Sequence, residues 1–208
     1  MDNEPLVFVV DDDAAMRKSL RFLIESVGLA VRTFDSAHSF LDGCDEQQRG
    51  CLVLDVRMPG MSGLELQDVL AQRKIQFPII IITGHGEVPM AVKAIQAGAM
   101  DFIEKPFSDQ VLLDRIQKAI AQDRVNREER TRRDGAVRLA ARLTPRERQV
   151  MALVVAGLPN KQIAAKLGLS QKTIEVHRAH VMSKMETESL PDLVREAQLA
   201  EVAATGKP

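Results

Sequence analysis

The alternation of β-rich apolar runs with helical patterns in residues 6–120 constrains the fold of this chain more than any other feature. Five short runs rich in Val, Ile, Leu and Phe are expected to form strands buried on both faces. The strands are expected at Leu6–Val10, Ala30–Phe34, Cys51–Asp55, Pro78–Thr83 and Asp101–Ile103, and the helices at Ala14–Val27, Ser36–Gly43, Gly63–Arg73, Val88–Ala97 and from Ser108 onward. This order predicts an α/β fold with a doubly wound, five-stranded parallel sheet.

The pattern changes after residue 122. Residues 123–140 break the alternation, and residues 123–134 contain almost no apolar side chains, so 123–140 is expected to form a charged linker or a solvated extension of the fifth helix. Residues 141–204 then show only helical patterns, with a helix start at Thr144-Pro145, a short helix at Asn160–Leu167, a third from Ser170 to about Met185, and a fourth from Ser189 to about Ala200. The tail 203–208 is expected to fray. The second part is therefore predicted to be a small all-α domain.

Charge divides the chain in the same way. Residues 1–122 carry 18 acidic and 12 basic side chains, whereas residues 141–208 carry 7 acidic and 10 basic ones. This asymmetry favours two modules with different partners. No apolar run reaches the roughly 18–20 residues of a membrane span, and the N-terminus lacks the apolar region of a secretory signal. With Cys44 and Cys51 as its two cysteines, the chain is expected in a reducing cytoplasm.

Polar side chains follow four of the predicted strands where ligands of open α/β sheets bind. Asp11-Asp12-Asp13 follows the first strand, Asp55 ends the third, Thr83 ends the fourth, and Lys105 follows the fifth. Clustered carboxylates suit Mg²⁺, and a carboxylate can attack a phosphoryl group whose oxygens a metal ion and a lysine neutralise. A single Asp at a strand end is more often a helix cap, and Asp13 is expected to be one.

These segments resemble a two-component receiver domain, which has a flavodoxin-like fold. The resemblance rests on four motifs, Val-Val-Asp11-Asp12-Asp13, Leu-Asp55-Val-Arg57-Met58-Pro59-Gly60-Met-Ser-Gly63, Ile-Ile-Thr83-Gly-His-Gly and Phe102-Ile-Glu-Lys105-Pro106-Phe. It implies that Asp55 accepts the phosphoryl group and that Asp12, Asp55 and the Arg57 backbone carbonyl hold Mg²⁺, with Asp11 acting through water. Thr83 and Lys105 would contact the phosphoryl oxygens. Thr83 and Phe102 would form the switch. Many relatives have Tyr at the position of Phe102, so the aromatic residue of this switch would lack a hydroxyl and act by packing alone.

The helical part has the spacing of a helix-turn-helix. Counted from Asn160, small Ala164 is fifth, Gly168 ninth and apolar Ile174 fifteenth. An ordinary helical hairpin would show the same spacing. The polar N-terminal half of the third helix favours DNA, because a recognition helix places that end in the major groove, although a solvated helix face would also be polar.

This segment resembles the LuxR-type helix-turn-helix through Leu143-Thr-x-Arg146-Glu147, Gly157-x-x-Asn160-Lys161-x-Ile163-Ala164 and Thr173-Ile-Glu-Val-His177-Arg178. The residues expected to meet DNA are Asn160, Lys161, Lys172, Thr173, Glu175, Val176, His177 and Arg178. Some relatives carry Lys in place of Glu175 and Ala179, so the DNA sequence bound here is expected to differ from theirs.

Both modules together resemble response regulators of the FixJ type. The resemblance implies a phosphorylation-controlled transcription activator and not an enzyme. Its implied partners are a sensor histidine kinase, double-stranded promoter DNA, RNA polymerase and a second copy of the chain in the phosphorylated state. Two other interpretations are an aspartyl-phosphate phosphatase and a helical module that binds protein. Arg57 occupies the position where a phosphatase would need a second carboxylate, and the basic third helix argues against the protein-binding interpretation.

Overall fold

The computed structural model describes residues 4–44, 48–84 and 88–205. The first unit contains a five-stranded parallel sheet of order β2-β1-β3-β4-β5. Its elements in the described residues are β1 (Leu6–Val10), α1 (Ala14–Glu25), β2 (Ala30–Phe34), α2 (Ala37–Gly43), β3 (Gly50–Asp55), α3 (Gly63–Gln72), β4 (Ile79–Thr83), α4 (Val88–Gln96), β5 (Asp101–Glu104) and α5 (Asp109–Ala141). The predicted doubly wound α/β fold is confirmed. His85, Gly86 and Glu87, which extend the Thr83 motif, lie outside the described residues.

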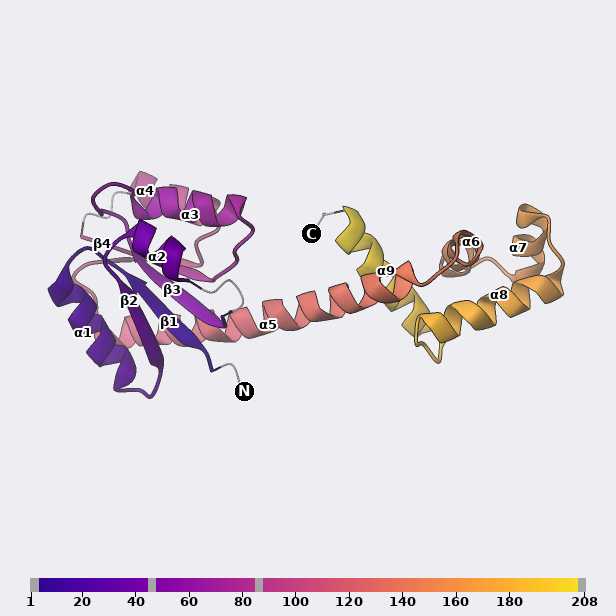
Figure 1. The fold of residues 1–208 in the computed structure, drawn as a ribbon, viewed down its shortest axis with the longest axis horizontal. Helices are drawn as coiled ribbons and strands as arrows, with labels where there is room; N and C mark the ends of the chain where they lie inside the picture. Colours follow the sequence, from indigo (N-terminus) through magenta and orange to yellow (C-terminus); the bar gives the residue numbers. More distant parts are fainter. Residues whose placement is uncertain (1–3, 45–47, 85–87, 206–208) are drawn as a thin grey trace. The chain divides into compact units, whose positions relative to one another are not determined.

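Both faces of the sheet are covered, because alternate residues of each strand point to opposite sides. Val7, Val9 and Val53 pack with α1 and α5, whereas Phe8, Val10 and Leu54 pack with α2, α3 and α4. Figure 1 shows helices on both sides of the strands. Burial on both faces explains why the strands have continuous apolar sequences.

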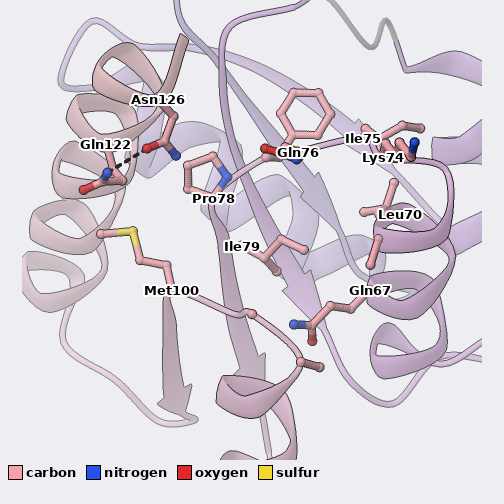
Figure 2. A pocket seen from close by; sticks show the side chains of 14 residues that line it. Gln67, Leu70, Lys74, Ile75, Gln76, Pro78, Ile79, Met100, Gln122 and Asn126 are labelled. Carbon is pink, nitrogen blue, oxygen red and sulfur yellow. Dashed lines mark hydrogen bonds between the residues drawn. The ribbon is translucent and has the colours of Figure 1, made fainter. Parts of the chain in front are cut away.

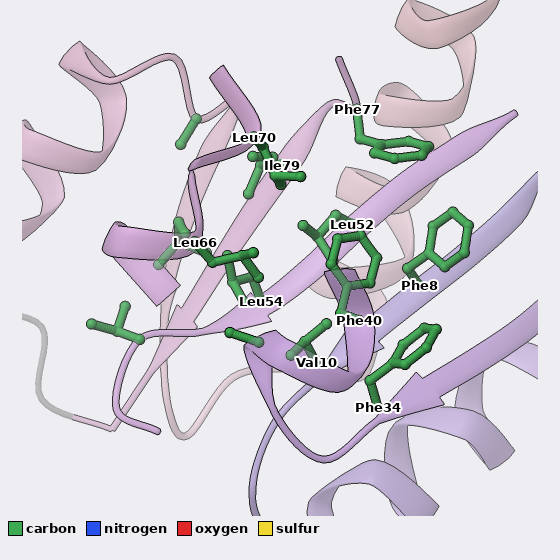
Figure 3. Close-up of a cluster of buried hydrophobic side chains, with 14 of the residues drawn as sticks. Phe8, Val10, Phe34, Phe40, Leu52, Leu54, Leu66, Leu70, Phe77 and Ile79 are labelled. Carbon is green, nitrogen blue, oxygen red and sulfur yellow. The ribbon is translucent and has the colours of Figure 1, made fainter. Parts of the chain in front are cut away.

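Aromatic rings fill the core on the α2–α4 side of the sheet. Phe8 lies 5.1 Å from Phe77 and 5.6 Å from Phe40 between ring centroids, and Phe34 lies 5.3 Å from Phe40. Figure 3 shows these rings gathered beside Leu52. Their tilted and edge-on arrangements are the favourable ones for aromatic pairs. The cluster joins β1, β2, α2 and the segment before β4.

Helix α5 continues through residues 123–140, the segment expected to be a charged linker or a solvated extension of the fifth helix. The chain divides into two compact units between Asn126 and Arg127, four residues beyond the expected limit of the first module at residue 122. Asp123 is 3% exposed, and its Oδ2 accepts a hydrogen bond from Gly50 N at 2.9 Å. This contact attaches the start of the charged segment to the start of β3.

The second unit is helical throughout. It contains the last part of α5 and the helices α6 (Pro145–Val155), α7 (Asn160–Leu167), α8 (Gln171–Lys184) and α9 (Leu190–Thr205). Ile163 and Ala164 of α7 pack with Ile174 of α8 in one buried cluster. Gly168 has a φ of 65°, the left-handed conformation that ends α7 and turns the chain toward α8. Helix α9 extends about five residues beyond its expected end.

Within the described residues, no helix combines the length and the apolar character that a membrane span requires.

Candidate phosphoryl-acceptor site and nucleic-acid interface

The carboxyl ends of the strands bring the predicted acidic residues together. The order of the sheet places β1 beside β3, so Asp11 after β1 and Asp55 at the end of β3 are neighbours. Lys105 Nζ lies 2.9 Å from Asp11 Oδ2 and 2.7 Å from Asp55 Oδ1. One ammonium group from the end of β5 therefore bridges two carboxylates from different strands.

Burial gives this ion-pair cluster its electrostatic character. The Asp11 and Asp55 side chains are 1% and 7% exposed, and Lys105 is 19% exposed. Burial raises the pKa of Asp55, since removal from water destabilises its charged form more than Lys105 stabilises it. Burial alone would lower the pKa of Lys105, but its hydrogen bonds to Asp55 and Asp11 raise it. The lysine is therefore held as a cation beside the carboxylates.

The remaining oxygens of the cluster are held by backbone amides. Arg57 N donates to Asp55 Oδ2 at 2.7 Å, and Asp13 N donates to Asp11 Oδ1 at 2.8 Å. Asp12 is exposed, as is the side chain of Arg57. Asp13 Oδ1 accepts from Ala15 N at 2.8 Å and from Met16 N at 3.4 Å, which confirms that Asp13 caps α1.

The backbone of Asp55 is confined by Gly63 at the start of α3. A Cβ on Gly63 would lie 2.2 Å from Asp55 O, a distance that no side chain tolerates. Ser62 caps α3, and Gly63 N donates to Val56 O at 3.0 Å. The glycine is therefore required for the close approach of the helix to the strand that carries Asp55.

The two expected switch residues lie on neighbouring strands. Thr83 at the end of β4 is fully buried, and its carbonyl accepts from Lys105 N at 2.7 Å. Phe102 on β5 is partly buried and packs against the hydrophobic core cluster that contains Ala94 and Ala99. The Lys105–Pro106 peptide bond is cis. Thr83 is thus connected through the backbone to the lysine of the acidic cluster.

The acidic cluster has ligands that fit a hard divalent cation. Two of its carboxylates already approach one positive charge, and Asp12, which directly follows Asp11, has an exposed carboxylate. Among residues 4–44, 48–84 and 88–205, no three His, Cys, Asp or Glu side chains gather closely enough to hold a metal by themselves. Mg²⁺ retains several waters when bound, so the Asp oxygens would be supplemented by water and by the Arg57 carbonyl.

A surface pocket of about 420 Å³ lies at the opposite edge of the sheet. Figure 2 shows Pro78 and Ile79 at the start of β4, with Gln122 and Asn126 of α5 on one side and Leu70 of α3 on the other. The pocket contains none of the acidic cluster, so its lining does not serve the chemistry predicted for Asp55.

The expected DNA-binding residues lie at the start of α7 and on α8 between Lys172 and Arg178. Lys161, Lys172, Glu175 and Val176 are exposed, whereas Asn160, Thr173, His177 and Arg178 are partly buried. Arg178 Nη1 donates to Asn160 Oδ1 at 2.7 Å, so these two side chains connect α8 to the start of α7. Thr173 lies beside the Ser170 cap of α8, with 2.8 Å between their hydroxyl oxygens. The expected residues thus divide into exposed groups and partly buried ones.

Glu147 is a structural residue of this unit that the sequence revealed only in part. With Thr144 it forms the cap at the start of α6, where its carboxylate accepts from Thr144 N at 2.8 Å and its backbone N donates to Thr144 Oγ1 at 3.3 Å. The same buried carboxylate also accepts from Lys184 Nζ at 2.6 Å. The hydrogen bond from Lys184, followed by that from Thr144, lowers the pKa of Glu147 to about 2. The Lys184 contact joins α6 to the end of α8 across 37 residues, a separation that no local motif encodes.

The fold, the acidic cluster and the helix-turn-helix together define a response regulator. Residues 7–117 match the response regulator receiver domain family, and residues 141–197 match the LuxR family of bacterial regulatory proteins. The chain belongs to the two-component response regulators with a LuxR-type DNA-binding domain, a family of FixJ-like transcription regulators that are not enzymes.

Curated relatives resemble the chain over nearly its whole length. It is 51% identical to the transcriptional regulatory protein FixJ of Rhizobium meliloti over 194 residues, covering 92% of this chain and 94% of that protein. It is 49% identical to nodulation protein W of Bradyrhizobium diazoefficiens over 199 residues, covering 96% and 88%.

Solved structures agree with this assignment. The response regulator StyR is 47% identical, with a TM-score of 0.83 over 94% of this chain and 98% of that one. Full-length FixJ from B. japonicum is also 47% identical, with a TM-score of 0.57 over 95% and 98%. The receiver domains of this family typically bind Mg²⁺ for phosphorylation, and membership implies a cognate histidine kinase and binding to DNA.

Proposed function

We propose that this chain is a cytoplasmic transcription activator that is switched on by phosphorylation of Asp55. Residues 1–122 would form the phosphoacceptor module, 123–140 the linker, and 141–204 the DNA-binding module. The observation that carries this proposal is the single lysine ammonium bridging Asp11 and Asp55 at the carboxyl edge of the sheet.

The proposed reaction is a phosphoryl transfer from a phosphohistidine of the sensor kinase. An Asp55 carboxylate oxygen attacks phosphorus, an O–P bond forms, the P–N bond breaks, and the imidazole leaves with the bonding electron pair. Lys105 stabilises the negative charge on the transferring oxygens. Asp12, Asp55 and the Arg57 carbonyl would hold Mg²⁺, with Asp11 acting through water, and the cation would supply the remaining neutralisation.

The signal would pass from Asp55 to a face made by α4, β5 and α5. Thr83 moves toward the phosphoryl group, and Phe102 follows by packing because its ring has no hydroxyl. Exposed apolar side chains on this face support its pairing with a second copy, namely Val92, Ile95 and Val111. A two-fold dimer would place two recognition helices about one DNA turn apart.

The DNA-binding proposal assigns roles by exposure. Lys161 and Lys172 would meet phosphates or guanine, Glu175 would accept from cytosine, and Val176 would contact an apolar base edge. Thr173, His177 and Arg178 lie beside them on α8, and Asn160 holds Arg178. The bound dimer would then recruit RNA polymerase to the promoter.

The test is DNA affinity for a randomised duplex pool, with and without a small phosphoryl donor and Mg²⁺. The donor is expected to raise specific binding by the wild-type chain and leave Asp55→Asn unchanged. Strong binding that ignores the donor would contradict the switch. Absence of binding in both conditions would favour a protein-binding helical module.

A further inference from the structure

Arg17 lies one turn into α1, directly behind the acidic loop. Its Nη1 donates to Asp11 O at 2.7 Å and to Asp12 O at 2.9 Å. Its own backbone N also bonds to Asp13 O at 3.0 Å in the first turn of the helix. One guanidinium nitrogen therefore holds two consecutive carbonyls of the loop that carries the predicted metal ligands.

The atoms that Arg17 contacts are informative. Both bonds go to backbone oxygens, so they fix the path of the loop without occupying the carboxylate oxygens of Asp11 and Asp12. Hydrogen bonds from a charged donor are stronger than neutral ones. The other bonds that shape this turn use the Asp11 and Asp13 carboxylates themselves. Arg17 thus supports the loop through its backbone and makes no bond to the exposed Asp12 carboxylate in these two contacts.

We propose that Arg17 is a positioning residue that preorganises Asp11 and Asp12 for Mg²⁺ and so for phosphoryl transfer to Asp55. This inference rests on the function proposed above. Groups that orient metal ligands typically change metal affinity by about 10–100-fold when they are removed. Sequence alone does not indicate this role for Arg17, because a cation near three acids suggests an ion pair, whereas its guanidinium donates to carbonyls.

Electrostatics and positioning predict opposite effects for the loss of this side chain. Removal of a positive charge near a divalent cation would, by Coulomb's law alone, tighten Mg²⁺ binding. Loss of the two carbonyl contacts would loosen the loop and weaken binding. The direction of the change in Mg²⁺ affinity therefore separates the two explanations.

The experiment compares Arg17→Met and Arg17→Lys with Lys18→Met in the full chain. Lys18 is an exposed neighbour on α1, so its substitution makes the same change in net charge without touching the loop. Mg²⁺ affinity is measured by isothermal titration calorimetry, and the unfolding midpoint by far-UV circular dichroism, since the chain has no Trp or Tyr. Phosphorylation by a small phosphoryl donor is followed in parallel.

Arg17→Met is expected to bind Mg²⁺ about 10–100-fold more weakly, with Lys18→Met unchanged. Arg17→Lys keeps the charge but not the two-carbonyl geometry, so it is expected to lie between Arg17→Met and wild type. If Arg17→Met does not fold, a weaker affinity of Arg17→Lys supports the proposal, and wild-type affinity overturns it. If a folded Arg17→Met binds Mg²⁺ as tightly as the wild-type chain, or more tightly, the proposal is also overturned. This holds even if the unfolding midpoint of the variant is lowered. A wild-type chain that takes up neither Mg²⁺ nor a phosphoryl group would instead contradict the proposed function.

Discussion

Replacement of Lys105 by Met removes the ammonium group that bridges Asp11 and Asp55 while keeping an unbranched side chain. The two carboxylate oxygens that it contacts at 2.9 and 2.7 Å can lie no more than about 5.6 Å apart. At an effective dielectric constant of about 20, two unit charges at that distance repel by about 3 kcal/mol. This agrees with the roughly 3–5 kcal/mol typical of breaking a buried ion pair, and the partial exposure of Lys105 favours the lower end.

The expected result is a loss of about 3 kcal/mol in the free energy of unfolding of Lys105→Met in Mg²⁺-free buffer at neutral pH. With a urea dependence of about 2 kcal/mol per M, the unfolding midpoint should fall by about 1.5 M. Added Mg²⁺ should restore most of this loss, because a divalent cation neutralises the same carboxylates. Phosphoryl transfer should remain slow, since Lys105 no longer stabilises the transferring oxygens.

Two further variants make the Lys105 experiment decisive. Lys118→Met removes an exposed lysine from α5 and is expected to leave the midpoint unchanged. Lys105→Met combined with Asp55→Asn removes both members of one pair and should recover much of the lost stability. Identical Mg²⁺-free midpoints for Lys105→Met and Lys118→Met would refute the argument that the lysine compensates the buried carboxylates.

Three other substitutions test the remaining structure. Gly63→Ala would place a methyl group 2.2 Å from Asp55 O, so it is expected to displace that strand end and lower both the phosphorylation rate and the melting temperature. Glu147→Gln should lower the melting temperature at neutral pH. Because the pKa of Glu147 is lowered from 4.5 to about 2, its stabilisation is present above about pH 4.5 and lost toward pH 2, so the variant should show a shallower decline in that range. Arg178→Met should weaken binding to duplex DNA and lower the slope of log affinity against log salt concentration by about one phosphate contact. The slope is measured from the affinity at several salt concentrations. An unchanged slope would place Arg178 away from the DNA backbone.

Local sequence was sufficient to predict the helices and strands and to locate the acidic cluster. Continuous apolar strands are expected when both faces are covered, and Ile79–Thr83 shows this most clearly. Parallel strands end at one edge, so Asp55 and Lys105 could be assigned to the same site although 50 residues separate them. The resemblance to receiver domains then suggested a role for each residue.

Contacts that depend on side-chain direction could not be derived in this way. Residues 123–140 were expected to be a linker or helix extension on composition, yet Asp123 is buried against Gly50 because α5 passes the start of β3. Arg178 was expected to face DNA, but it also donates to Asn160, which an adjacent helix supplies. In both cases the partner is distant in sequence and no periodic pattern identifies it.

The sequence by itself determined the alternating architecture, the capped helix starts and the set of chemical groups at the strand ends, because periodicity, capping and strand direction are local properties. Only the tertiary structure decided which oxygens those groups contact. Lys105 bridges two carboxylates, Arg17 holds carbonyls and Glu147 pairs with Lys184 because packing of the helices against the sheet, and against one another, fixes the distances between these atoms. Distances and burial set the electrostatic energies, and both depend on the folded chain.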